Sequence, residues 1–201
     1  MISLFLDTST NVFNTVLLKD NKVIDSFTKE YDKDLSKEAL FRIKEMLDKN
    51  NLKPNDLDEI VCVRGPGSFT GLRIGVTIAK TIAYFLNKNL YSVSSLEVMA
   101  TSTKGKVIVP IIDARRGYVY AAVYNDNYNT LMEEAYIKKE ELDKIAKTFS
   151  NDITYVENDF TSNIVLLYKC SFKKEENPIN FEPNYLKKPE AEEKLNDSQS
   201  S

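Results

Sequence analysis

Two stretches of this 201-residue chain begin in the same way, and that repetition limits the folds open to it. Near the N-terminus an apolar strand over Ile2–Leu6 precedes two strand-like runs, Thr15–Leu18 and Val23–Phe27, joined by a polar turn. The pattern restarts with a strand at Val107–Ile112, a turn and a second strand at Tyr118–Tyr124. Strands that alternate with helical segments are typical of an α/β protein. The repetition therefore predicts a duplicated architecture of two lobes.

Helical spacing of apolar residues predicts an amphipathic helix at Ser36–Asn50 and a second, longer helix that ends near Leu86. Further strands are expected at Ile60–Val63, Leu90–Val93 and Ile153–Val156, and further helices at Ser95–Ala100, Glu140–Thr148 and Thr161–Tyr168. We predict a first lobe over 1–103, a smaller second lobe over 104–189 and a charged polar tail over 190–201.

Composition excludes several kinds of chemistry. The chain has no histidine, so zinc sites and catalytic triads that depend on histidine are excluded. Cys62 and Cys170 lie among apolar neighbours, which predicts buried free thiols and a reducing compartment. The net charge is −3 and the lysines are scattered singly along the sequence, which predicts no nucleic-acid footprint on this chain alone. Without a basic leader or a membrane-length apolar run, we expect a cytoplasmic protein.

A glycine-rich loop, Gly65–Gly71, follows a strand and begins a helix, a position where backbone N–H groups can hold an anion. Its spacing matches neither a Walker A loop nor a dinucleotide fingerprint, which favours a structural turn with Ser68 or Thr70 as helix cap. Asp7 and Asp113 follow the first strand of each lobe and could form a carboxylate pair, but turn and capping roles are favoured. The weak candidates for cofactor binding are therefore Asp7, Ser68, Thr70 and Asp113.

The helix after this loop carries small residues at every fourth position: Gly71, Gly75, Ala79 and Ala83. Such a ridge lets another element approach closely. The rest of the helix is apolar almost all round, so it needs cover on two sides. Two interpretations remain open. The helix is sandwiched inside this chain, or one side meets another protein.

Several segments together resemble one bacterial family. They are Ile2–Thr10, Gly65–Val76, Ser92–Glu97, Asp113–Tyr120 and Asn184–Glu193. In this order they are similar to the TsaB (YeaZ) family, densely over the first 124 residues and again near the end. The resemblance implies an α/β protein with the two-lobed actin, Hsp70 and sugar kinase-like fold (ASKHA, RNase H-like), with mixed sheets and a reduced second lobe.

The resemblance also implies a role in forming N6-threonylcarbamoyladenosine at position 37 of tRNAs that read codons beginning with A. TsaB-family proteins are the non-catalytic partners of TsaD, which transfers the carbamoyl group, while the ATPase TsaE joins them and TsaC supplies threonylcarbamoyl-adenylate. The family also forms homodimers through helices of the first lobe. By this resemblance the chain has no catalytic residue, metal or cofactor of its own, the partner proteins use ATP, and tRNA is met only through the complex.

We therefore expect the first-lobe helices to form the partner surface. The expected interface residues are Leu40, Ile43, Leu47, Leu72, Arg73, Gly75, Val76, Ala79, Lys80 and Ala83. The alternative is a small ASKHA-type nucleotide-binding enzyme or phosphotransferase that uses Gly65–Gly71 for phosphate. Against it, no glycine follows Gly117, so the adenosine-binding loop of catalytic relatives has no candidate in this sequence.

Overall fold

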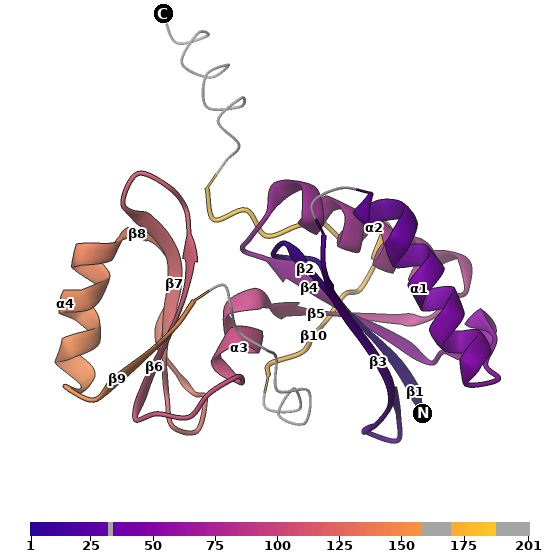
Figure 1. The fold of residues 1–201 in the computed structure, drawn as a ribbon, viewed down its shortest axis with the longest axis horizontal. Coiled ribbons are helices and arrows are strands. Elements are labelled where there is room, and N and C mark those ends of the chain that lie inside the picture. Colours follow the sequence, from indigo (N-terminus) through magenta and orange to yellow (C-terminus); the bar gives the residue numbers. More distant parts are fainter. Residues whose placement is uncertain (32–33, 158–169, 188–201) are drawn as a thin grey trace, which may run out of the picture.

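The computed structural model describes residues 1–31, 34–157 and 170–187. In this part of the chain two lobes lie side by side, with a short helix between them (Figure 1). The helix predicted at Thr161–Tyr168 and the tail predicted from residue 190 lie outside the described residues.

The first lobe is built on a six-stranded mixed sheet with the order β10-β5-β4-β1-β2-β3. Its strands are β1 (Ile2–Asp7), β2 (Val12–Lys19), β3 (Lys22–Glu30), β4 (Glu59–Gly65), β5 (Asn89–Ser94) and β10 (Lys173–Lys174). β1, β2 and β3 form an antiparallel meander, whereas β4 and β5 run parallel to β1. The predicted opening of three strands is confirmed.

Alternating side chains on β1 enter two different cores. Leu4 and Leu6 pack beneath α1 (Leu35–Lys49) and α2 (Phe69–Phe85), which cover one face of the sheet. Phe5 points to the other face and packs with Val98 of α3 (Ser95–Ala100). This period of two is the pattern expected of a strand buried on both faces. Short 3-10 turns at Pro54–Asp56 and Pro178–Asn180 complete the elements of this lobe.

The second lobe repeats the first on a smaller scale. Its strands β6 (Val107–Asp113), β7 (Tyr118–Asn125), β8 (Thr130–Lys138) and β9 (Ile153–Val156) form a sheet with the order β8-β7-β6-β9. β6 is antiparallel to β7 and parallel to β9, as β1 is to β2 and β4. The helix α4 (Lys139–Phe149) follows β8, as α1 follows β3. The predictions of a duplicated architecture and of a reduced ASKHA-type second lobe are confirmed.

The interior of the second lobe also divides between two faces. Val119, Ala121 and Val123 of β7 pack against α4 on the outer face. Tyr120 and Tyr124 point the other way and pack with Leu96 and Met99 of α3. Because α3 contacts strands of both sheets, it joins the lobes, as Figure 1 shows.

Two strands were not expected from the sequence, and one bears on the domain limits. β8 places Glu133 and Glu134 next to each other on an edge strand, which hides the alternation of apolar residues. β10 has only two residues and pairs with β5 of the first lobe. The predicted limits 1–103, 104–189 and 190–201 stay a prediction. Residues 173–181, however, lie with the first lobe, because β10 pairs with β5 and Phe181 packs in the first-lobe core.

Candidate functional site

The carboxyl ends of β1, β4 and β6 carry the residues that the sequence singled out. Asp7 ends β1 and is 3% exposed. Its Oδ1 accepts hydrogen bonds from the Ser9 N–H at 2.9 Å and the Ser9 hydroxyl at 2.7 Å. Burial raises the pKa of this carboxyl, and the bonds from Ser9 oppose the rise. Asp7 therefore holds the β1–β2 turn, the role that the sequence favoured.

Asp113 plays a similar part in the second lobe. Its Oδ1 accepts a hydrogen bond from the Arg115 N–H at 2.9 Å, which closes the turn after β6. Asp113 also borders a hollow of about 250 Å³, lined in addition by Tyr118, Lys139 and Glu157. Both aspartates thus have turn partners of their own, and no bond between them is seen among the described residues.

The glycine-rich loop packs against the β1–β2 turn. The Ser68 N–H donates to the Ser9 carbonyl oxygen at 2.7 Å, and the Ser68 hydroxyl caps α2 by accepting from the Gly71 N–H at 3.3 Å. A side chain at Gly71 would overlap the Thr8 carbonyl oxygen. Because Gly71 has no side chain, the loop can lie close to the β1–β2 turn of the same chain. This is the role of a structural turn. Thr70 lies exposed in the first turn of α2.

The small-residue ridge of α2 is used in the same way. Gly71, Gly75, Ala79 and Ala83 are all buried, and a side chain at Gly75 would overlap the Thr8 hydroxyl. The ridge therefore packs onto the chain's own sheet. Of the two interpretations that the sequence left open for this ridge, the structure therefore has the one in which it packs inside this chain.

Most of the expected interface residues lie inside the first lobe. The buried ones are Ile43, Leu47, Leu72, Gly75, Val76, Ala79 and Ala83. Leu40 and Arg73 are exposed, and Lys80 is partly exposed. The interface itself stays a prediction, but its buried members are core residues. The surface of the α1–α2 layer is instead marked by Leu40, Phe41, Tyr84 and Phe85, and Phe85 is 78% exposed.

A C-terminal segment, residues 181–187, crosses from one lobe to the other, and we call it the strap. Phe181 is buried in the core under α1 and α2, and the Asn184 N–H donates to the Arg64 carbonyl oxygen at 2.7 Å. The ring of Tyr185 lies 4.9 Å from that of Phe69, centroid to centroid. Leu186 then packs on the second-lobe core. The strap therefore runs over the start of α2 and links the two lobes.

Carboxylates gather where the strap meets the facing surfaces of the lobes. Asn184 Nδ2 donates to Glu134 Oε2 at 3.1 Å, and the Ser171 N–H donates to Glu97 Oε1 at 3.2 Å. Burial raises the pKa of both glutamates. Neither glutamate is among the site residues predicted from the sequence. Their signal is weak, because they become neighbours only when the lobes close on each other.

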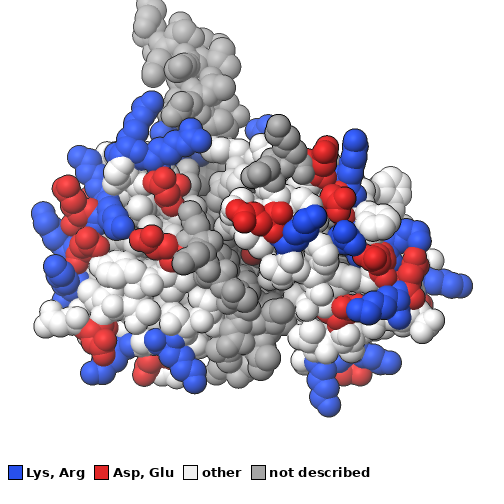
Figure 2. All heavy atoms as spheres, in the orientation of Figure 1, with Lys and Arg blue, Asp and Glu red and all other residues white. Residues whose placement is uncertain are grey.

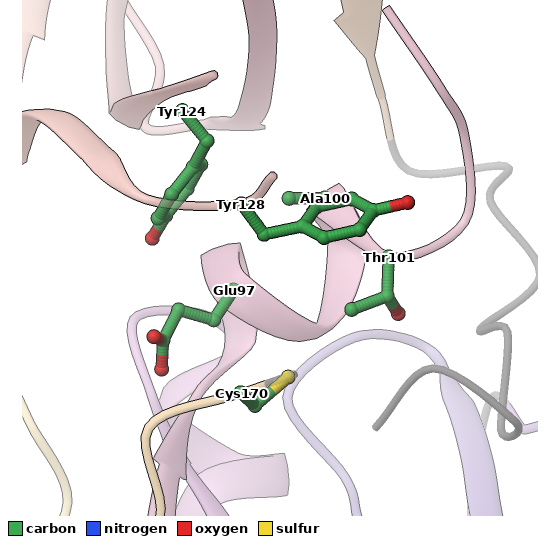
Figure 3. Close-up of a pocket in the computed structure, with 6 residues that line it drawn as sticks. All are labelled: Glu97, Ala100, Thr101, Tyr124, Tyr128 and Cys170. Atoms are coloured by element: carbon green, nitrogen blue, oxygen red, sulfur yellow. The ribbon is translucent and has the colours of Figure 1, made fainter. Parts of the chain in front are cut away.

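Figure 3 shows the pocket around Glu97. Glu97, Ala100 and Thr101 come from α3 and its end, and Tyr124 and Tyr128 come from the second lobe. Cys170 completes the lining; it is a free thiol of intermediate exposure, and burial raises its pKa to about 12. The pocket has no room for a water molecule. The lobes are thus closed on each other here.

The described ranges hold neither a metal-binding group nor a membrane-spanning helix. No group of three or more cysteine, aspartate or glutamate side chains there is placed to hold a metal ion. No described helix is both long and apolar enough to cross a membrane.

Comparison with known proteins points to one group of relatives. Residues 29–172 match the sequence profile of a family described as TsaD, tRNA N6-adenosine threonylcarbamoyltransferase. The Bacillus subtilis tRNA threonylcarbamoyladenosine biosynthesis protein TsaB is 40% identical over 136 residues, which cover 67% of this chain. The match spans only 59% of that relative. An uncharacterized protein of Mycoplasma genitalium is 30% identical over 193 residues, 92% of this chain and 95% of its own.

Solved structures agree with this grouping. YeaZ from Pseudomonas aeruginosa matches with a TM-score of 0.63 and 26% identity, over 68% of this chain and 67% of that chain. An uncharacterized protein described as similar to peptidase YeaZ from the same organism matches with a TM-score of 0.74 and 20% identity. That match covers 92% of this chain and 99% of the other, and it shows the same fold.

Proposed function

Because this chain belongs to the TsaB (YeaZ) family, we propose that it takes part in forming N6-threonylcarbamoyladenosine on tRNA as a non-catalytic partner of TsaD. The observation that carries the proposal is the 40% identity to a protein named for this biosynthesis, together with the TsaD-family match over residues 29–172. TsaE is the proposed third component, and a homodimer is an alternative use of the same surface.

The packing around the Gly65–Gly71 loop supports an accessory role. Nucleotide-binding relatives need bare backbone beside the phosphates, but here the Gly65–Gly71 loop is packed against residues of the β1–β2 turn. The strap also crosses the start of α2, where a phosphate would meet the helix. The alternative of a nucleotide-binding enzyme predicts tight binding of ATP and magnesium by the isolated chain, which calorimetric titration measures directly.

The activity test is reconstitution of the modification. Purified TsaC, TsaD and TsaE are incubated with tRNA, ATP, threonine and bicarbonate, with and without this chain, and the modified nucleoside is measured by mass spectrometry. We expect modification that depends on the chain. Equal modification without it, by cognate partners, would overturn the proposal.

For docking to TsaD we propose the exposed apolar side chains of the α1–α2 layer. Phe41 is 57% exposed on α1, and Phe85 is 78% exposed at the end of α2. Large apolar side chains at this exposure are typical of interaction surfaces when they gather in one layer. A charge at Ala79 is no test of this surface, because the side chain is fully buried and the charge would unfold the lobe.

The docking test uses charge substitutions on the exposed rings. We expect Phe41→Glu or Phe85→Glu to lower co-purification with TsaD by about tenfold, the effect of losing about 1.4 kcal/mol of binding free energy. Phe149→Glu is the matched control, since Phe149 is also exposed but ends α4 on the far side of the second lobe. If all three variants co-purify equally with TsaD, the proposed surface is wrong.

A further inference from the structure

Cations that are scattered in the sequence gather at one edge of the second lobe. They lie on the turn after β6, at the junction of β8 with α4, and at the end of the strap: Arg115, Arg116, Lys138, Lys139 and Lys187. We call this group the basic rim. Figure 2 shows blue side chains concentrated at the top of this lobe, where β8 meets α4 in Figure 1. Cations that are scattered in the sequence are thus neighbours in the fold, and the expectation of no nucleic-acid footprint stays a prediction.

The rim keeps a positive excess although the whole chain carries −3. Against its five cations stand four nearby carboxylates: Asp113, Glu140 and Glu141 on its own elements and, across the sheet edge, Glu157. Glu133 and Glu134 lie further along β8. Lys139 pairs with Glu157 at 3.3 Å, and Asp113 is bonded to the Arg115 backbone N–H. The Arg115 guanidinium has no ion pair with any described carboxylate. Its charge therefore remains available to a ligand.

Two stacked tyrosines hold two of the lysines in place. The rings of Tyr118 and Tyr136 are parallel to within 9°, with centroids 4.6 Å apart. Lys138 Nζ lies 5.9 Å from the centroid of Tyr118, and Lys187 Nζ lies 5.3 Å from that of Tyr136. Each cation–π contact contributes only about 0.5–1 kcal/mol at an exposed site. It also limits the rotamers of a long side chain, so less entropy is lost when the ammonium group binds an anion.

The turn that presents the arginines adopts a backbone unusual for them. Arg115 and Arg116 have φ angles of 67° and 56°. The β2–β3 turn has the same left-handed conformation at Asp20 and Asn21, residue types that tolerate it. Two arginines cost roughly 1–2 kcal/mol each in this conformation. A strained turn that displays two guanidinium groups favours a role in binding.

We propose that the basic rim binds the phosphate backbone of tRNA. The inference rests on the proposed function, which supplies a polyanionic substrate. Arginine matches phosphate with paired N–H donors, and lysine adds point charges, so the set suits a run of phosphates. The rim lies on the second lobe, away from the α1–α2 layer, and both surfaces can be occupied together (Figure 1). The expected contacts are to backbone phosphates, because the tyrosine rings already stack on each other.

The test removes charge without adding strain. Arg115→Asn keeps a residue that tolerates the left-handed turn, and Lys138→Gln keeps the length of the side chain. The matched control is Lys104→Gln with Lys106→Gln, which removes the same charge from the opposite end of β6. Binding of labelled, unmodified tRNA to the full-length chain is followed by fluorescence anisotropy at several potassium chloride concentrations.

We expect the rim double variant to bind tRNA about tenfold more weakly. The slope of log affinity against log salt should fall by about 1.4–1.8, since each phosphate contact contributes roughly 0.7–0.9. The control should bind as the wild type does. No binding by the wild type, or equal binding by the two double variants, would overturn the proposal. So would equal competition by polyglutamate or by anionic vesicles at matched charge, which would assign the rim to an acidic protein or a membrane.

Reconstitution separates this inference from the proposed function. If the chain is required for modification while the rim variant leaves the KM for tRNA unchanged, the rim proposal fails and the accessory role stands. If modification proceeds without the chain, the accessory role fails, and the rim is judged by the anisotropy result alone.

Discussion

Glu97 illustrates how the closed lobes change the chemistry of a single residue. It lies on α3, between the two sheets, and its carboxylate accepts a hydrogen bond from the Ser171 N–H. Burial is the main cause of its raised pKa, and the negative Glu133 adds to it. The folded state therefore binds this proton more tightly than the unfolded state. The stabilisation is complete below the ordinary glutamate pKa and is lost as the pH rises through the raised value.

Glu97→Gln should remove this dependence. Glutamine keeps an oxygen that accepts from the Ser171 N–H but carries no charge. At neutral pH we expect the Tm to rise, by on the order of 2 °C for a chain of this size, while at about pH 4 the two proteins should melt alike. Thermal unfolding followed by circular dichroism over this pH range measures it. Glu182→Gln, an exposed change on the strap, is the control, and a lower Tm of Glu97→Gln at neutral pH would contradict the prediction.

The turn between β6 and β7 is the element where stability and the proposed binding conflict. Replacing Arg115 with Asn and Arg116 with Gly should relieve two left-handed arginines. We expect the free energy of unfolding to rise by about 1–2 kcal/mol and tRNA binding to fall. Urea denaturation gives the first quantity and anisotropy the second. A double variant that is less stable than the wild type would show that the arginine side chains stabilise the turn.

The sequence predicts most elements because their patterns are local. The period of two in β1 and the helical spacing of α1 are visible in single segments, and the structure has both elements within one or two residues. β8 and β10 are missed because each takes its form from a neighbour. β8 is an edge strand with adjacent glutamates, and β10 is two lysines paired with β5.

The candidate site was only partly accessible to sequence reasoning. The turn roles of Asp7 and Asp113 and the capping role of Ser68 follow from residue type and position, and the structure confirms them. The ridge of α2 shows the limit. Its spacing predicts a close approach, but only the fold reveals that the neighbour is Thr8 of the same chain. The basic rim is invisible in sequence because the turn, the β8 end and Lys187 meet only in three dimensions.

At the scale of the whole molecule, the strap ties the two lobes at one edge and α3 ties them between the sheets. Phe181 anchors the strap in the first lobe, and Tyr185 packs on Phe69 at the start of α2. Leu186 and Asn184 then reach the second lobe. A segment that contacts both bodies restrains their relative motion more than its own small area suggests, since opening the lobes breaks its contacts with one of them.

Loosening the strap should therefore speed up amide hydrogen exchange in both lobes. In the double variant Tyr185→Ala, Leu186→Ala, we expect amide hydrogen exchange to speed up about tenfold at the start of α2 and along β8, equivalent to about 1.4 kcal/mol less opening free energy. Hydrogen-exchange mass spectrometry reads both segments in one experiment. Phe149→Ala, which shortens an exposed ring on the outer helix α4, controls for general destabilisation. Faster exchange at the start of α2 with β8 unchanged would mean that α3 alone holds the lobes together.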